Sequence, residues 1–250
     1  MSDKMSDILV FNNVEMSYYD IYKETKVLKD LSFTIIDKSI TTIIGPSGCG
    51  KSTILNLIAD LIKPTNGKIL KPNSIGYMFQ KDNLFDWLKI KDNVLIGLKI
   101  QNKLTEENIA YANELLNKYG LEEFINSYPN ELSGGMRQRV ALIRALVVKP
   151  KVLLLDEPFS ALDSQTRIEV SSDIYKIIKE LKITTVLVTH DISEAIGLSD
   201  NIILLSKRPA SIIKELPIKF NYLNPIERRN NSLFSTYFNE IWSEISGQKS

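Results

Sequence analysis

Short runs that contain only apolar residues and threonine recur along the chain, and they predict its fold class. The runs cover residues 40–44, 152–155, 184–189 and 202–205. Apolar residues without alternation are typical of parallel strands that are buried on both faces. Two predicted helices lie between these strands in the sequence. Apolar residues at helical spacing indicate one over 52–61, and the other is expected over 164–181. The alternation of strands and helices predicts an α/β fold with a mostly parallel sheet and crossover helices.

The N-terminal residues follow a different pattern, which predicts antiparallel strands. Residues 8–18 read as one strand that ends at an aromatic side chain, and apolar residues alternate with polar ones over 27–36. Such alternation indicates a strand with one face in water. The tyrosine-rich segment 19–26 between them is expected to be a loop or a hairpin. We therefore expect an N-terminal antiparallel β subdomain.

Strand signals disappear after a short strand at 75–79, and helical spacing takes over. Thr105 is a suitable helix N-cap, because two glutamates follow it in the first turn. The next apolar residues lie on one helical face, and Gly120 ends that helix. We interpret about 81–150 as a helical subdomain inserted into a single domain, 1–250.

The tail of the chain has apolar residues at helical spacing over about 225–246. They are Phe234, Tyr237, Phe238, Ile241 and Ile245. A face of this kind more often packs against its own chain than against a partner. We therefore expect a packed C-terminal helix.

Composition narrows the setting in which the protein works. The 31 basic and 30 acidic residues nearly balance, so no electrostatic footprint for nucleic acid is present. No run approaches the ~20 apolar residues that a membrane span requires. One cysteine excludes an internal disulfide, and the polar N-terminus lacks a signal peptide. These features predict a cytoplasmic protein that would need another chain to cross a membrane.

The segment Gly45-Pro46-Ser47-Gly48-Cys49-Gly50-Lys51-Ser52 has the form G-x-x-x-x-G-K-[ST] of a phosphate-binding loop. A predicted strand precedes it and a predicted helix follows it, which disfavours a chance glycine-rich turn. Its backbone N–H groups and the helix start are expected to hold phosphate, with Lys51 on the β/γ-phosphates. The Ser52 hydroxyl is a candidate Mg²⁺ ligand. We predict binding of a nucleoside triphosphate with Mg²⁺ by residues 45–53, including Thr53.

Two carboxylates, Asp156 and Glu157, follow the predicted buried strand at 152–155. Ligands of open parallel sheets bind at the carboxyl ends of the strands. An acid at this edge can hold Mg²⁺, and its neighbour can orient or deprotonate a water molecule. The alternative, two solvated loop carboxylates, is disfavoured because an unbroken apolar strand precedes them.

Further motifs make the resemblance to ABC-type ATPases plain from about residue 8 to 209. They are Leu132-Ser133-Gly134-Gly135-Met136 (signature), Val152 to Pro158 (Walker B), Gln80 (Q-loop), Ser160-Ala161-Leu162-Asp163 (D-loop), His190 (switch) and Tyr18 (adenine stacking). Tyr19 remains an alternative for the stacking residue. The resemblance implies that Gln80 and His190 sense the γ-phosphate, with Gln80 and Asp156 at the metal and Glu157 polarising the water.

The resemblance also implies a head-to-tail homodimer, in which Ser133, Gly134, Gly135 and Asp163 of one copy complete the nucleotide site of the other. Many members have glutamine at the position of Met136, which cannot donate a hydrogen bond. Cys49 is either incidental packing or, because its loop is electropositive, a reactive thiol whose alkylation would block ATP.

Several segments resemble the importers of the nitrate, sulfonate and taurine type. The segment around Trp87 is similar to the corresponding segment of these importers, although Asp86 stands where they commonly have proline. Met136 in the signature motif is a second point of resemblance. This resemblance implies a subunit on the cytoplasmic face of the membrane that drives solute uptake. Its partners would be a permease and an extracytoplasmic solute-binding protein. Sulfonate, taurine, nitrate and a thiamine-precursor pyrimidine remain open as solutes.

Two other functions remain as alternatives. One is a soluble ABC-type mechanical ATPase without a transport role, and the other is the ATPase subunit of an exporter. Phe85 and Trp87 either line a groove for a permease helix or pack inside the helical lobe.

Overall fold

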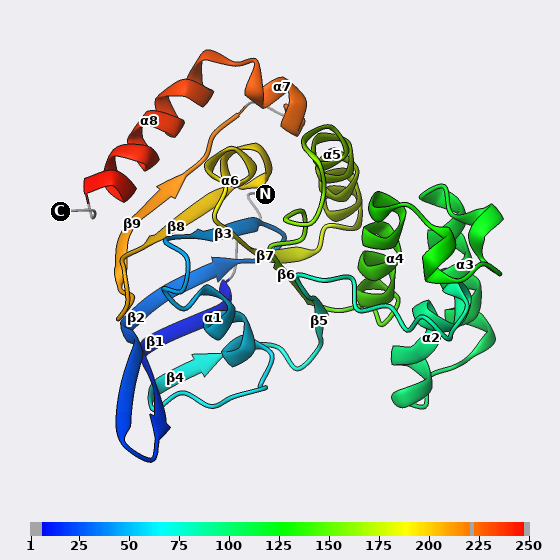
Figure 1. The fold of residues 1–250 in the computed structure, drawn as a ribbon, viewed down its shortest axis with the longest axis horizontal. Helices are drawn as coiled ribbons and strands as arrows, with labels where there is room; N and C mark the ends of the chain where they lie inside the picture. The colour runs from blue at the N-terminus through cyan, green and yellow to red at the C-terminus, as the bar shows by residue number, and fades with distance from the viewer. Residues whose placement is uncertain (1–6, 221–222, 248–250) are drawn as a thin grey trace, which may run out of the picture. The chain divides into compact units, whose positions relative to one another are not determined.

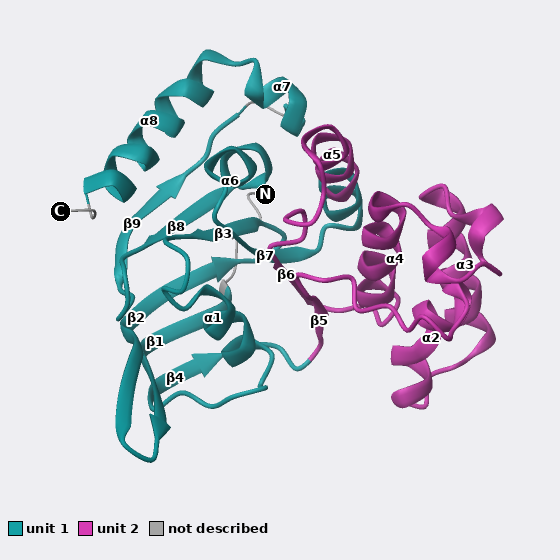
Figure 2. Ribbon diagram, viewed as in Figure 1, with its two compact units in different colours: residues 1–73, 175–250 teal, residues 74–174 magenta. Residues whose placement is uncertain are grey.

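The structure, a computed structural model, describes residues 7–220 and 223–247. The chain forms two compact units, one of residues 1–73 and 175–250 and the other of residues 74–174 (Figure 2). The boundary lies within the long helix α5 (Ser164–Leu181).

The first unit contains two sheets (Figure 1). The antiparallel sheet has the order β2-β1-β4, formed by Lys23–Ile36, Asp7–Asp20 and Asn66–Leu70. The second sheet has the order β7-β3-β8-β9, formed by Thr184–Thr189, Ile40–Ile44, Asn201–Leu205 and Ile212–Pro217. Strands β7, β3 and β8 are parallel, and β9 is antiparallel to β8. The predicted α/β class and the antiparallel N-terminal subdomain are confirmed.

Four helices also belong to the first unit: α1 (Lys51–Ile58), α6 (Ile192–Leu198), α7 (Pro225–Arg229) and α8 (Ser232–Gly247). The chain places two helices where one tail helix is expected. Asn231 separates them, because its side chain accepts a hydrogen bond from the backbone N–H of Leu233 in the first turn of α8 (3.0 Å).

The apolar face of α8 packs against its own unit, as predicted. Its five predicted residues lie in one cluster with buried residues of β8 and α6, and Ile241 is 2% exposed. Helix α6 and strand β8 supply Ile192, Ala195, Ile196, Ile202 and Leu204 to the same cluster.

The second unit pairs strands β5 (Ile75–Met78) and β6 (Val152–Asp156) in parallel. Its helices are α2 (Ile90–Ile100), α3 (Glu106–Lys118) and α4 (Gly134–Leu146), with short 3₁₀ turns at Glu122–Phe124 and Pro129–Glu131. Thr105 caps α3 as predicted, since its side chain accepts from the N–H of Asn108 (3.3 Å). The helices expected over 81–150 therefore form, and they lie within this unit.

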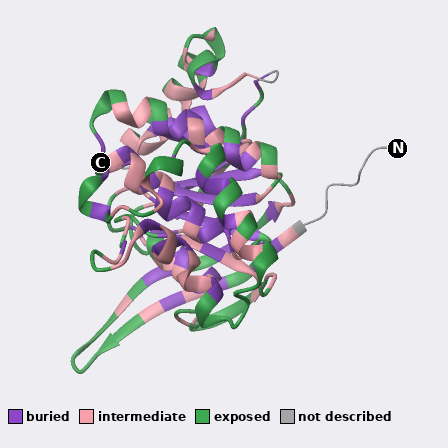
Figure 3. Ribbon diagram, turned by 90° about the vertical axis from the view of Figure 1, so that its right-hand side faces the viewer, coloured by how far each residue is buried: buried purple, intermediate pink, exposed green. Residues whose placement is uncertain are grey.

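The tyrosine-rich segment 19–26 is a hairpin rather than a loop. Strand β1 continues to Asp20 and β2 begins at Lys23, so only Ile21 and Tyr22 form the turn. Tyrosine favours strands, and cross-strand pairing extends through the polar residues. The tip is exposed, with Tyr22 at 94% (Figure 3).

Within the described part of the chain, no helix has both the length and the apolarity to span a membrane.

We predict that Ile241→Ala lowers the free energy of unfolding by about 3 kcal/mol, because it leaves a cavity between α8, α6 and β8. Urea denaturation of the full chain would measure this loss. Leu233→Ala, on the same helix at an exposed position (46%), should cost less than about 1 kcal/mol. Equal stability of Ile241→Ala and the unaltered protein would contradict the packed tail.

Candidate nucleotide-binding site

The predicted phosphate-binding loop connects β3 to α1 in the first unit. Gly48 and Gly50 have φ angles of +73° and +122°, which residues with a Cβ rarely adopt. A Cβ on Gly50 would also lie 2.8 Å from side-chain atoms of Val27 and Leu28. Both the backbone conformation and the packing beneath the loop therefore require glycine at Gly50.

The Lys51 side chain lies against this loop and is only 6% exposed. Its Nζ donates to the carbonyl oxygens of Gly45 (3.0 Å) and Pro46 (3.1 Å). Neither acceptor is a carboxylate, so the ammonium charge is not neutralised by these contacts. A buried, uncompensated cation beside a glycine loop is suited to a phosphate group.

Helix α1 begins at Lys51, and no side chain among the described residues caps its N-terminus. The helix start therefore offers N–H groups and the positive end of a dipole to an anion. Ser52 and Thr53 are the second and third residues of this helix.

Tyr18 is the tyrosine that contacts the loop helix. Its hydroxyl lies 3.5 Å from Oγ1 of Thr53, whereas the Tyr19 hydroxyl donates to Glu24 at 3.4 Å. Tyr18 is 42% exposed, so part of its side chain remains open to a ligand. Of the two candidates left open by the sequence, Tyr18 therefore lies beside the phosphate loop.

His190 stands at the same sheet edge as the phosphate loop. Strands β3 and β7 are parallel with Ile44 opposite Thr189, so Gly45 and His190 leave neighbouring strands together. The Thr189 hydroxyl donates to Oε2 of the buried Glu194 (2.6 Å). These contacts anchor the backbone on one side of the exposed His190, while Asp191 caps α6 on the other.

In the second unit, parallel pairing brings Gln80 and the two carboxylates to one edge. Met78 pairs with Leu155, so Gln80 and Glu157 both lie two residues beyond this pair. The Gln80 Nε2 donates to the Ser160 hydroxyl (3.4 Å), which donates to the Glu157 carbonyl oxygen (3.0 Å). Glu157 has a φ of +43°, an uncommon conformation for a non-glycine residue.

Asp156 is 8% exposed and accepts a hydrogen bond from the Tyr77 hydroxyl (3.4 Å). Burial, together with the negative charge of Asp156, raises the pKa of Tyr77 far above its usual range. The phenol therefore stays protonated and acts as a donor. Sequence alone places Ser160 in the D-loop motif but does not show that it joins Gln80 to Glu157, and only the position of Tyr77 near Gln80 marks that tyrosine.

The signature segment opens helix α4. Ser133 is the N-cap, and its side chain accepts from the N–H of Met136 (3.3 Å). A Cβ on Gly135 would approach side chains of Thr166 and Val170 to 3.1 and 3.0 Å. Gly135 therefore lets α4 pack closely on α5.

Asp163 lies just before α5 and is exposed. Its Oδ1 accepts from the N–H groups of Gln165 and Thr166, both at 3.1 Å. Hydrogen bonds from the Thr166 side chain and backbone lower the pKa of this carboxyl. Asp163 is thus an ionised helix cap at the D-loop position.

Cys49 does not fit the reactive-thiol hypothesis. Its side chain is 1% exposed, and burial raises the pKa of the thiol despite the nearby charge of Lys51. Its Sγ lies 3.1 Å from where a Cβ on Gly45 would be. The thiol therefore packs beneath the loop, and only the Cys49 backbone can face a ligand.

The predicted site residues form two groups, one in each unit. The first unit assembles the phosphate loop, Tyr18 and His190. The second unit assembles Gln80, Asp156 and Glu157 at a sheet edge, and holds Ser133, Gly134, Gly135 and Asp163 at the starts of α4 and α5.

Comparison with known proteins gives the context of this geometry. The model of the ABC transporter family matches residues 28–160. An uncharacterized ABC transporter ATP-binding protein of Bacillus subtilis, YtlC, is 44% identical over 245 residues, which cover 94% of each chain. The taurine import ATP-binding protein TauB of Pelagibacter ubique is 40% identical and covers 86% of this chain and 84% of its own.

Among solved structures, a dimeric ATP-binding cassette in a post-hydrolysis state, MJ0796 bound to ADP and Pi, has a similar fold. The two structures align with a TM-score of 0.73 and a sequence identity of 32%. The alignment covers 86% of this chain and 100% of the cassette's chain.

We predict that Lys51→Ala weakens ATP binding at least about 30-fold, since it removes the charge that pairs with phosphate. Titration of a fluorescent ATP analogue would measure the affinity. The control is Lys63→Ala, which removes an exposed lysine that forms an ion pair with Asp60. This variant should bind ATP with the affinity of the unaltered protein. Equal affinities of the two variants would rule out the assigned role of Lys51.

Proposed function

The chain belongs to the ABC transporter family as an ATP-hydrolysing, ATP-binding subunit of the sulfonate and taurine type. From this premise we propose that it couples ATP binding and hydrolysis to the uptake of a small solute through a permease on another chain. The observation that supports the proposal most directly is the glycine loop with Lys51 at the uncapped start of α1.

The first unit supplies the groups that bind ATP. The loop N–H groups and α1 hold the phosphates, and Lys51 exchanges its carbonyl contacts for phosphate oxygens. Tyr18, which is held near Thr53 and half exposed, stacks on the adenine ring.

Mg²⁺ is proposed as the metal that accompanies ATP. The described residues include no group of three or more His, Cys, Asp or Glu side chains able to hold a metal. Mg²⁺ takes few protein ligands and completes its shell with phosphate and water. Ser52, Gln80 and Asp156 would supply the protein oxygens, and Tyr77 orients the Asp156 carboxylate. When bound, the metal neutralises phosphate charge.

Glu157 is proposed to polarise the attacking water. The Glu157 carbonyl oxygen accepts a hydrogen bond from the Ser160 hydroxyl, and the same hydroxyl accepts one from Gln80. Hydrogen bonds therefore connect the Q-loop glutamine to the loop that carries Glu157. His190, placed beside Gly45 by strand pairing, contacts the γ-phosphate. Loss of that phosphate changes the contacts of His190 and Gln80 together.

A second copy of the chain is proposed to complete each site. The start of α4 presents Ser133, Gly134 and backbone N–H groups, which form a second anion site. The solved neighbour named as a dimeric cassette supports this arrangement. ATP between two copies stabilises the dimer by mass action, and hydrolysis lets it open.

The solute is proposed to be a sulfonate such as taurine, on the basis of the relative named a taurine importer. Nitrate and a thiamine-precursor pyrimidine remain alternatives within the same branch. The proposed setting is the cytoplasmic face of the membrane, with an extracytoplasmic binding protein that delivers solute to the permease.

The proposed permease contact is the Phe85–Trp87 segment. Trp87 is 73% exposed, and its ring lies 5.2 Å from that of Phe85. The buried side chain of Asn93 fixes this segment, accepting from the N–H of Phe85 (2.7 Å) and donating to the carbonyl of Leu88 (2.9 Å). A rigid segment with an exposed aromatic ring is suited to docking a short helix.

We predict that Glu157→Gln retains ATP binding but accumulates as an ATP-bound dimer, because the neutral amide cannot accept a proton from water. Light scattering coupled to gel filtration, in ATP and Mg²⁺, would detect the dimer. Glu107→Gln, an exposed residue paired with Lys149, serves as the control and should hydrolyse ATP normally. A Glu157→Gln variant that still turns over ATP would contradict its assigned role.

The transport role is tested by affinity purification of the tagged chain from detergent-solubilised native membranes. We expect a polytopic membrane protein to co-purify, and Trp87→Ala to reduce its recovery severalfold with unchanged ATP binding. Trp242→Ala removes another exposed tryptophan (53%) and should not reduce recovery. Recovery of soluble partners alone would overturn the transport role and leave the nucleotide site intact.

A further inference from the structure

A cavity of about 690 Å³ opens in the first unit, apart from the phosphate loop. Its lining comes from the end of α5, the residue before β8, the segment after β9, and α7. The lining residues are Tyr175, Lys179, Asp200, Ile218, Lys219, Phe220 and Arg228. Three are cations and one is an anion. The volume lies within the ~300–1,000 Å³ of small-molecule sites.

Arg228 is the most buried of these cations, at 3% exposed. Its guanidinium donates to the carbonyl oxygens of Leu223 (3.1 Å), Ile196 (3.3 Å) and Ser199 (2.8 Å), and to the Tyr175 hydroxyl (3.2 Å). Arginine has five N–H donors, so one on Nη2 lacks an acceptor among the described residues. None of the four acceptors is a carboxylate, so no anionic side chain of the described residues hydrogen-bonds to this buried charge.

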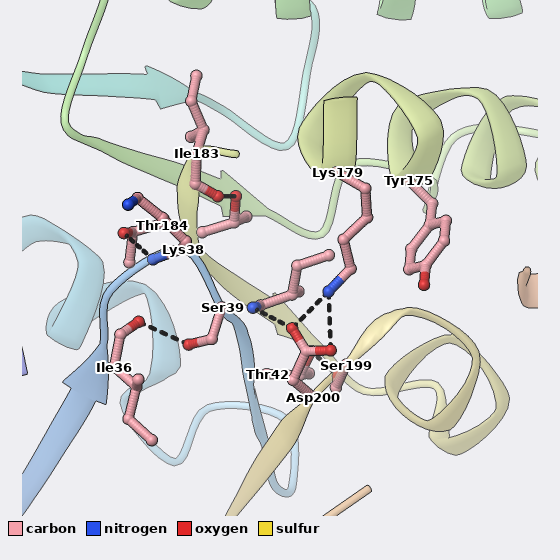
Figure 4. A network of polar contacts seen from close by, with 12 residues as sticks. Ile36, Lys38, Ser39, Thr42, Tyr175, Lys179, Ile183, Thr184, Ser199 and Asp200 are labelled. Atoms are coloured by element: carbon pink, nitrogen blue, oxygen red, sulfur yellow. Dashed lines mark hydrogen bonds and ion pairs between the residues drawn. The ribbon is translucent and has the colours of Figure 1, made fainter. Parts of the chain in front are cut away.

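The other polar residues that line the cavity also have more hydrogen-bond donors than there are free acceptors around them. The Tyr175 hydroxyl accepts from Arg228, and its own hydrogen has no acceptor in the described part of the chain. Lys179 uses two contacts on Asp200, at 2.8 and 2.7 Å (Figure 4). Asp200 also accepts from the N–H of Ile40 (2.8 Å), so the one carboxylate of the cavity is occupied.

The walls between these donors are apolar and aromatic. The Arg228 guanidinium lies 5.3 Å from the Tyr175 ring centroid and 5.2 Å from that of Phe220. Ile218 is buried beside Phe220, while Lys219 is exposed and makes no ion pair with a described residue. Cations and unused donors around an apolar wall favour a ligand with an anionic head and a short apolar body.

We propose that this cavity binds a small organic oxyanion, with Arg228, Tyr175, Lys179 and Lys219 around the head group and Ile218 and Phe220 against the apolar body. The site lies at the opposite end of β3 from the phosphate loop. Asp200 bonds to Ile40, the first residue of β3, whereas the loop follows Ile44, the last residue. Five strand residues separate them by about 15 Å. The proposal is independent of the transport function.

The test is calorimetric titration of the full chain with 1-propanesulfonate at constant ionic strength. We expect a dissociation constant of about 1 mM, from the usual binding energy per atom of such small ligands. Methanesulfonate has the same head group and two fewer methylenes, and should bind about tenfold more weakly. Saturation of the phosphate loop with ADP should leave propanesulfonate binding unchanged.

Three variants connect the binding to the cavity. Lys219→Ala removes an exposed cation of the lining and should weaken binding about fivefold. Tyr175→Phe retains the ring, loses the hydroxyl donor and should have a similar effect. Lys176→Ala removes an exposed lysine next to Tyr175 that does not line the cavity, and should bind within about twofold of the unaltered chain.

Several results would overturn the proposal. They are an absence of binding, equal affinity for methanesulfonate and propanesulfonate, displacement by ADP, no loss in Lys219→Ala, or an equal loss in Lys176→Ala. Displacement by ADP would place the anion in the phosphate loop, and an equal loss in Lys176→Ala would indicate diffuse surface attraction.

Discussion

The register between neighbouring parallel strands is the constraint on which both groups of candidate site residues depend. Ile44 pairs with Thr189 in the first unit, and Met78 with Leu155 in the second. Within each unit, the residues beyond the pair therefore leave the strands at the same edge, although they are far apart in sequence. Strands β3, β6 and β7 are buried along their whole length, so their apolar packing holds the register. The apolar packing of the strands thus sets where these polar groups lie.

The phosphate loop depends on a second constraint, which comes from outside the strand and helix that it joins. Gly50 packs against Val27 and Leu28 of the antiparallel sheet so closely that a methyl group would not fit. The thiol of Cys49 lies beneath the same loop. The antiparallel sheet therefore supports the loop from below, and its hairpin also places Tyr18 beside Thr53. Loop shape and the aromatic neighbour of the nucleotide site come from one subdomain.

The opposite end of the same strands has a different electrostatic character. There Asp200 joins β3, α5 and β8 through Ile40 and Lys179, and Arg228 holds the carboxyl end of α6 through Ile196 and Ser199. Carbonyl groups at a helix end are partial negative charges, which makes a buried guanidinium tolerable without a carboxylate. The same arrangement leaves positive charge and unused donors facing a cavity. The phosphate-binding loop thus follows one end of β3, and the cavity proposed to bind a smaller anion lies at the other end.

Local sequence was sufficient for the features that depend on neighbouring residues. The buried strands, the glycine loop at 45–52, the caps at Thr105 and Ser133 and the acids after β6 all follow from spacing and residue type over a few positions. Tertiary structure decided the rest. It placed the Tyr18 hydroxyl beside Thr53, buried Cys49, joined Tyr77 to Asp156, and brought Tyr175, Asp200 and Arg228 around one cavity. The contacts Tyr18–Thr53, Tyr175–Arg228 and Tyr77–Asp156 join residues 35, 53 and 79 positions apart in sequence, and no periodicity along the chain encodes such contacts.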